Sequence, residues 1–213
     1  MTPTAKDASF VVALLIASQP VMAGSILGSA HDFTPYAWSR GQVCIACHDS
    51  HNANHAITAA PMWNHAVSTQ TYTLYGSPSM KATVGQPGQL SKLCLSCHDG
   101  TVAVDSFGGG TGGQYISNAN NIRPALNDDH PIGFVYDSAL ASADGTLFDP
   151  VSKSVTIGSG SDTQTGTLAT LMLFSGQMEC ASCHDVHNKF TVGTSGLVRL
   201  DPAGAMCKAC HNK

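Results

Sequence analysis

The residues best suited to chemistry in this chain are its cysteines, and all eight fall into four copies of one pattern. Each copy reads Cys-x-x-Cys-His, and the four are Cys44-Ile-Ala-Cys47-His48, Cys94-Leu-Ser-Cys97-His98, Cys180-Ala-Ser-Cys183-His184 and Cys207-Lys-Ala-Cys210-His211. This spacing is the attachment signature of c-type haem, in which two thiols add to the vinyl groups and the adjacent imidazole binds the iron. The sequence therefore predicts four covalently attached haems, each with two cysteines and one proximal histidine.

Three other uses of paired cysteines explain the pattern less well. Structural zinc takes four ligands and does not require a histidine directly after every pair. A thioredoxin-like motif normally occurs once, near a βαβ pattern that this sequence lacks. Disulfides suit an exported chain, but a two-residue spacing repeated four times is a poor framework for joining distant segments.

Six histidines remain besides the four proximal ones, and they are candidates for the second axial position of each iron. A second histidine gives six-coordinate iron of low potential with no open site for a substrate, which favours electron transfer over catalysis. We expect four distal ligands to come from a set of five, namely His31, His51, His65, His130 and His187. We interpret His55 as a solvated neighbour of His51, and the seven methionines as packing residues.

Two motifs continue with nearly the same residues, Cys47-His-Asp-Ser-His-Asn52 and Cys183-His-Asp-Val-His-Asn188. On a helical turn, His51 projects from the same side as His48, whereas the two axial ligands of one iron approach from opposite faces of the ring. We therefore expect His51 and His187 each to bind a haem other than that of the motif they follow. The nearest candidate for His187 is the haem of His211.

The elements that position these motifs are expected to be few and short. Charged residues make up only 11% of the chain, and 21 of its 213 residues are glycine, so haem has to supply much of the buried apolar surface. We expect a small multihaem cytochrome c fold: mostly irregular coil, with short helical turns at the motifs, wrapped around closely stacked haems. One hairpin is predicted, with Val151, Val155 and Ile157 on one face, a turn over 158–162 and a second strand over 163–174.

The amino terminus has the features of an export signal. Residues 10–16 form an apolar stretch too short to span a bilayer, and residues 21–23 place small side chains before a cleavage point at Gly24. We expect residues 1–23 to be a signal peptide and residues 24–213 to form a single tetrahaem domain outside the cytoplasm, without a membrane span. A formal net charge of −4, to which haem propionates add, gives no basis for binding nucleic acid or anionic lipid.

Five segments together resemble the doubled Cys-x-x-Cys-His multihaem cytochromes of metal-reducing and related bacteria. They are Ser29–Phe33, Cys44–Ala53, Pro61–His65, Leu93–Thr101 and Asp129–Gly133, and they span most of the expected mature chain. Four haems in about this length is also similar to the tetrahaem subunit of extracellular cytochrome filaments, the microbial nanowires, whose haems stack into a continuous chain.

The filament resemblance implies a homopolymer in which a histidine of one subunit completes a haem of its neighbour, through His51 or, alternatively, His31. The partners are then other copies of the chain, redox proteins or an extracellular metal oxide. Few charges mean little desolvation on assembly, although a loop-rich surface explains the low charge equally well. The alternative is a monomeric periplasmic carrier whose distal ligands are all internal. A multihaem reductase needs a five-coordinate haem and catalytic groups that the sequence does not show, so we expect no enzyme.

Overall fold

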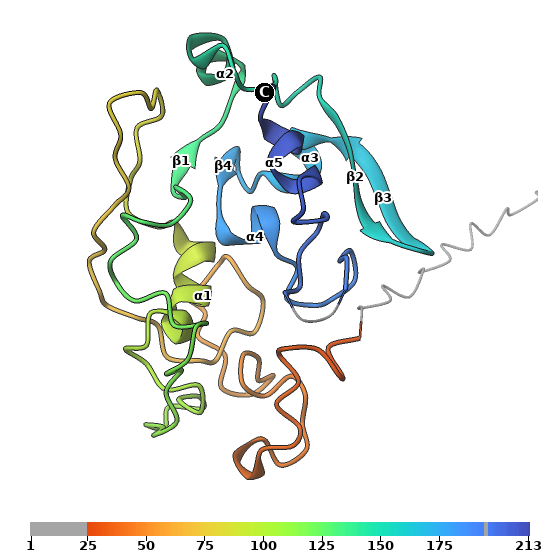
Figure 1. Cartoon of the computed structure of the whole chain (residues 1–213). Coiled ribbons are helices and arrows are strands. Elements are labelled where there is room, and N and C mark those ends of the chain that lie inside the picture. Colours follow the sequence, from red (N-terminus) through yellow and green to blue (C-terminus); the bar gives the residue numbers. More distant parts are fainter. Residues whose placement is uncertain (1–24, 194–195) are drawn as a thin grey trace, which may run out of the picture.

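The structure, a computed structural model, describes residues 25–193 and 196–213, so the predicted signal peptide lies outside it. Most of the described chain is turn and irregular backbone (Figure 1). The N-terminal part contains η1 (Ala37–Ser39) and α1 (Gln89–His98). The other elements are short, and in chain order they are β1 (Phe134–Val135), α2 (Ser138–Asp144), β2 (Ser154–Ser159), β3 (Asp162–Thr167), α3 (Leu168–Met172), β4 (Gln177–Met178), α4 (Cys180–Cys183) and α5 (Ala205–Cys210).

The predicted hairpin is present as β2 and β3, which pair antiparallel over their full length. Val155 and Ile157 are buried on one face as expected, whereas Val151 precedes the strand and is exposed. The second strand ends at Thr167, earlier than predicted. The Thr167 side chain there accepts a hydrogen bond from the backbone N–H of Thr170 and caps the N-terminus of α3.

The main apolar core lies in the C-terminal part of the chain. The hairpin packs against α3, and β1 pairs with β4 beside them (Figure 1). The buried members of this cluster are Phe134, Tyr136, Ala141, Val155, Ile157, Leu168, Met172, Leu173, Met178 and Ala209. A second cluster, of Tyr72, Leu95 and Leu126, packs at α1. The core that the chain builds for itself is therefore concentrated after residue 133.

A buried polar network joins α1 to α4. The Glu179 carboxylate, 5% exposed, accepts hydrogen bonds from both the backbone N–H and the hydroxyl of Ser91. The Ser91 hydroxyl oxygen accepts a bond of 2.9 Å from the Cys180 N–H, and the Glu179 N–H donates to the Ser182 hydroxyl at 2.9 Å. Because α1 carries Cys94 and α4 begins at Cys180, this network fixes the second and third motifs relative to each other.

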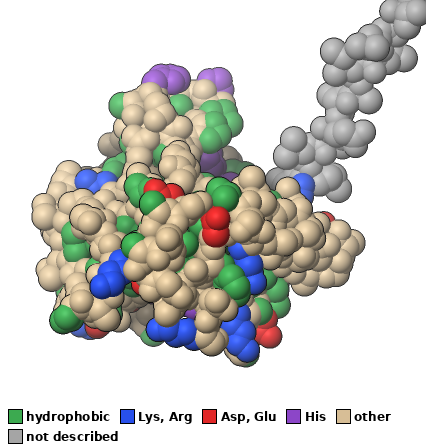
Figure 2. Space-filling view, turned by 90° about the horizontal axis from the view of Figure 1, so that it is seen from above, with side chains coloured by type: hydrophobic (Ala, Val, Ile, Leu, Met, Phe, Trp, Pro, Cys, Tyr) green, Lys and Arg blue, Asp and Glu red, His purple; other side chains and the backbone are tan. Residues whose placement is uncertain are grey.

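Charged side chains are sparse on the surface of the molecule. Figure 2 shows a face covered mainly by uncharged side chains, with Lys and Arg scattered among them and histidines reaching the surface at the upper edge of the view. Within 25–193 and 196–213, no helix is both long enough and apolar enough to cross a membrane.

Candidate functional site

Each Cys-x-x-Cys-His motif closes one helical turn. The second, third and fourth motifs lie on α1, α4 and α5, whereas the first forms an isolated turn. In that turn the His48 N–H donates to the Cys44 carbonyl at 2.8 Å, and the same bond closes the third motif at 3.1 Å and the fourth at 2.9 Å. An i to i+4 bond brings the first thiol and the imidazole one turn apart. The predicted helical turn at each motif is confirmed.

A separate piece of chain lies antiparallel against the end of three motifs. The bridges are His48 with Trp63, His184 with Val198 and His211 with Leu147. In each bridge, the backbone N–H of the residue after the bridge partner donates to the carbonyl of the second cysteine at 2.8 Å; these bonds run from Asn64 to Cys47, from Arg199 to Cys183 and from Phe148 to Cys210. The N–H of the residue after the histidine donates to the carbonyl of the residue before the bridge partner at 2.8–3.1 Å; these bonds run from Asp49 to Met62, from Asp185 to Leu197 and from Asn212 to Thr146. These bridging segments position the histidines.

The repeat between the first and third motifs is longer than the sequence indicated. Residues 61–64 and 196–199 make the same bridge contacts, and Met62 and Leu197 share a positive φ of 54° and 49°. The two bridging segments have different sequences, Pro-Met-Trp-Asn and Gly-Leu-Val-Arg. The similarity of the two bridging segments therefore cannot be seen in the sequence. The sequence shows only the Asp that follows each motif histidine, Asp49 or Asp185, which accepts the hydrogen bond that forms the shared turn.

The same bridging segments fix the imidazole tautomer. The Nδ1 atoms of His48 and His184 lie 2.7 Å and 2.8 Å from the carbonyl oxygens of Pro61 and Gly196. The Nδ1 of His98 lies 2.8 Å from another backbone carbonyl oxygen, that of Asn120. Because a carbonyl only accepts, Nδ1 must carry the proton, so Nε2 keeps its lone pair. A backbone bond at one ring nitrogen is the usual way to orient a histidine that binds metal through the other.

Three of the five predicted distal histidines lie close to a motif histidine. The ring centres of His48 and His187 are 6.3 Å apart. Those of His98 and His31 are 6.0 Å apart, and those of His211 and His130 are 6.5 Å apart. The sequence placed His187 nearest to the haem of His211, but the structure places it beside His48.

The other spare histidines have different surroundings. His51 and His55 are exposed. His65 is 3% exposed, and its Nδ1 and Nε2 lie 2.7 Å and 3.0 Å from the carbonyl oxygens of Ala66 and Ala103. Both ring nitrogens of His65 therefore face backbone carbonyl oxygens. No histidine ring among the described residues faces His184 as closely as in the three pairs above.

The helical premise used for His51 and His187 is wrong. α4 ends at Cys183, and His184 has extended backbone (φ −112°, ψ 145°) because it bridges to Val198. His187 lies in the turn that follows, where its backbone N–H donates to the Asp185 carboxylate at 3.2 Å. Asp185 is 8% exposed and also accepts from the Phe190 N–H at 2.9 Å. The direction of His187 is therefore set by this turn and not by helical spacing.

The cysteine thiols of successive motifs are neighbours. Burial raises the pKa of Cys97 to about 12, and the nearby Cys47 of the first motif adds to the shift. Contact with Cys180 raises the pKa of Cys94 well above its usual value, and burial adds to this. Burial also raises the pKa of Cys210 to about 12, with Cys183 contributing. Thiols of successive motifs therefore lie near one another, and all eight cysteines are free.

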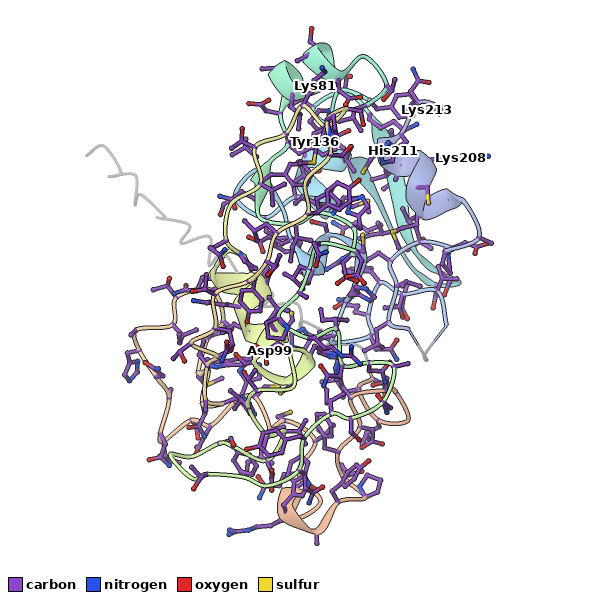
Figure 3. All side chains as sticks on the ribbon, turned by 60° about the vertical axis from the view of Figure 1, so that its left-hand side comes forward. Lys81, Asp99, Tyr136, Lys208, His211 and Lys213 are labelled. Atoms are coloured by element: carbon purple, nitrogen blue, oxygen red, sulfur yellow. The ribbon has the colours of Figure 1, made fainter. Side chains whose placement is uncertain are left out.

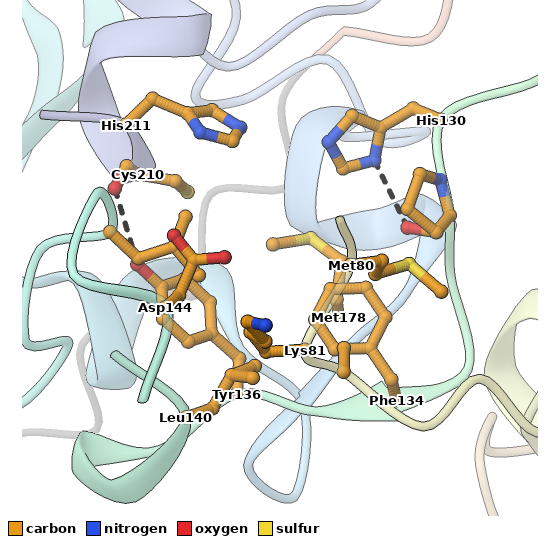
Figure 4. A pocket seen from close by; sticks show the side chains of 13 residues that line it. Met80, Lys81, His130, Phe134, Tyr136, Leu140, Asp144, Met178, Cys210 and His211 are labelled. Carbon is orange, nitrogen blue, oxygen red and sulfur yellow. Dashed lines mark hydrogen bonds between the residues drawn. The ribbon is translucent and has the colours of Figure 1, made fainter. Parts of the chain in front are cut away.

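The fourth motif opens onto a pocket that is partly open to solvent. His211 and His130 point toward each other across it, and Phe134, Leu140 and Met178 line its wall (Figure 4). The Tyr136 hydroxyl donates to the carbonyl oxygens of Phe148, at 2.7 Å, and Cys210, at 3.3 Å. Figure 3 places His211 and Tyr136 at the end of the molecule away from Asp99. The largely apolar lining is typical of cofactor pockets.

The donor set fits haem better than a bare metal ion. Among residues 25–193 and 196–213, no group of three or more His, Cys, Asp or Glu side chains is arranged to hold a metal ion. A haem iron needs only one protein ligand on each face of the ring. Free thiols in pairs, each followed by a histidine, are present at all four motifs, and in three of them a backbone carbonyl orients the imidazole. No protein-family model matches the chain, and no curated protein matches it either.

Proposed function

We propose that the chain is a secreted c-type cytochrome that binds four haems covalently and transfers electrons. The observation that carries this proposal is the repeated local geometry: four Cys-x-x-Cys-His turns, three of them with the histidine Nδ1 on a backbone carbonyl. Cysteine pairs 44/47, 94/97, 180/183 and 207/210 hold the haems, and His48, His98, His184 and His211 provide the proximal ligands. When bound, each haem supplies an iron that takes up or gives off one electron.

The contribution of the protein is to hold the four sites close together. Thiols of the first and second, second and third, and third and fourth motifs influence one another's pKa values. The Glu179–Ser91 network fixes the central pair. Neighbouring sites support electron transfer from one motif to another.

We further propose that the protein assembles into an extracellular conductive filament. His51 is exposed and adjoins the first motif, while His184 has no opposing histidine ring among the described residues. His51 of a second copy can therefore complete the haem of His184, and this pairing also suits the low surface charge. His31, the alternative donor, is half-buried beside His98 and is less accessible to another subunit.

Electron microscopy of protein recovered from outside the native cells tests this function, with haem content measured by absorbance on the same sample. Filaments with four haems per chain are the expected result. Dispersed monomers with four haems favour a periplasmic carrier and contradict the filament. Absence of haem contradicts the proposal as a whole.

A further inference from the structure

We infer that three of the four haem irons are each held between two histidines from distant parts of the chain: His48 with His187, His98 with His31, and His211 with His130. The inference rests on the proposed haem binding and assigns its axial ligands. It uses three of the five candidate distal residues and leaves His51 and His65 outside the set.

The spacing of the rings supports this pairing. A metal–imidazole bond is about 2.0 Å long and an imidazole nitrogen lies about 1.2 Å from its ring centre, so two rings on opposite sides of one metal have centres about 6.4 Å apart. The three pairs have ring separations of 6.3 Å, 6.0 Å and 6.5 Å. Each separation matches the value expected for two imidazoles that bind one iron from opposite sides.

The free nitrogens are consistent with the first pair. The Nδ1 of His48 is bonded to the Pro61 carbonyl, so its Nε2 is available. His187 is exposed, and its turn is fixed by the buried Asp185. Because His187 follows the third motif, its binding to the haem of His48 brings the first and third haems together. The two halves of the chain are thereby joined through one iron.

The second pair contains an unsatisfied buried atom. The Nδ1 of His31 is buried and has no hydrogen-bond partner in the protein. Its ring lies 6.0 Å from that of Phe33 as well as from that of His98. A buried polar side chain without a protein partner calls for a ligand from outside the polypeptide. The Nδ1 of His98 is bonded to the Asn120 carbonyl, so the Nε2 of His98 is also free to share that ligand.

The third pair lies on the pocket already described. His130 and His211 face each other across it (Figure 4). The Nδ1 of His130 lies 3.0 Å from the carbonyl oxygen of Pro131, which leaves its Nε2 free. The apolar wall between them suits the face of a macrocycle.

The three pairs differ in the angle between their rings. The planes of His48 and His187 are 21° apart, whereas those of His98 and His31 are 80° apart and those of His211 and His130 are 75° apart. In low-spin ferric haem the unpaired electron occupies one of two iron orbitals that overlap with the imidazole π systems. Parallel planes separate these orbitals in energy and give a rhombic EPR signal, and crossed planes leave them nearly equal and give a signal with one dominant g value.

EPR of the ferric holoprotein and of three variants tests the assignment. His187→Ala should leave four haems attached, turn one haem high-spin and remove the rhombic signal of the parallel pair. His31→Ala and His130→Ala should each turn one haem high-spin and remove part of the signal with one dominant g value. Added imidazole should restore the low-spin state in all three variants, which a merely structural defect would not permit.

The matched control is His55→Ala, an exposed histidine without a ring partner, which should leave every signal unchanged. If one of these three variants keeps four attached haems and all of them stay low-spin, the histidine replaced in it is not an axial ligand and that pair is overturned. Loss of the crossed-plane signal in His187→Ala overturns the assignment of His187 to His48. Fewer than four haems in the unmodified protein contradicts the proposed function itself and is distinguishable from these results.

Discussion

The two parts of the chain carry two Cys-x-x-Cys-His motifs each, yet they are built differently. Among the described residues, all of the named strands and the larger apolar cluster lie in 134–213. Residues 25–133 contain one α-helix and a buried cluster of Tyr72, Leu95 and Leu126. The C-terminal part therefore has an apolar core made by the chain, whereas the N-terminal part depends on other interactions.

Hydrogen bonds to side chains provide some of those interactions in the N-terminal part. The Asp99 carboxylate, 2% exposed, accepts bonds from the Ser68 hydroxyl at 2.6 Å, the Tyr72 hydroxyl at 2.8 Å and the Thr101 N–H at 2.7 Å. Such bonds fix geometry but contribute little net stability, because the unfolded chain forms equivalent bonds to water. We therefore expect the proposed haems to stabilise the N-terminal part more than the C-terminal part.

Removing the second haem should have the largest effect. In a Cys94→Ala, Cys97→Ala variant, we expect one haem to be absent. Without the apolar surface of that haem, residues 25–133 should lose all protection from limited proteolysis. The control is Cys207→Ala with Cys210→Ala, which should also lose one haem but keep 134–174 protected. A stable three-haem protein with unchanged protection in 25–133 would show that haem is not the main support of this region.

Leu168→Ala tests the other side of the comparison. Leu168 is fully buried in the C-terminal cluster, and its truncation should lower the free energy of unfolding by about 2–5 kcal/mol. Denaturant unfolding of the holoprotein measures this loss. Leu27→Ala, at a residue 59% exposed, should change it by less than about 0.5 kcal/mol. An equal loss of unfolding free energy in the two variants would mean that the C-terminal cluster does not stabilise the protein more than an exposed residue does.

Glu179→Ala should have a smaller effect, at the joint between the two parts. It leaves the Ser91 N–H and hydroxyl without their acceptor, which should cost about 1–3 kcal/mol. Denaturant unfolding of the holoprotein again measures the change, and Gln164→Ala, at an exposed residue of β3, is the control. If Glu179→Ala changed the free energy of unfolding no more than the control does, this network would not be what holds α1 against α4.

Local features could be predicted from the sequence. The motif turns follow from five adjacent residues, and the hairpin follows from alternating apolar residues before the Gly-Ser-Gly turn at 158–160. The end of the second strand was missed because a single side chain, Thr167, caps the next helix. Where the alternation of apolar and polar residues is weak, a single capping side chain can decide where a strand ends.

Long-range contacts could not be predicted. The bridging segments 61–64 and 196–199 have no common residue pattern, and the ring that faces His187 belongs to the opposite part of the chain. The helical premise behind the interpretation of His51 and His187 was wrong because α4 stops before His184, whereas their binding to the haem of another motif stays a prediction. A partner for each histidine requires the tertiary structure, in which the Glu179 network and the Asp185 turn fix the geometry.

The intact mass of the purified protein, measured before and after treatment with a thiol-alkylating reagent under denaturing conditions, tests the central claim most directly. The account predicts the mass of the polypeptide, with its N-terminus determined on the same sample, plus four haems, and no alkylation of any of the eight cysteines. A haem-free mass with eight alkylated thiols would contradict it.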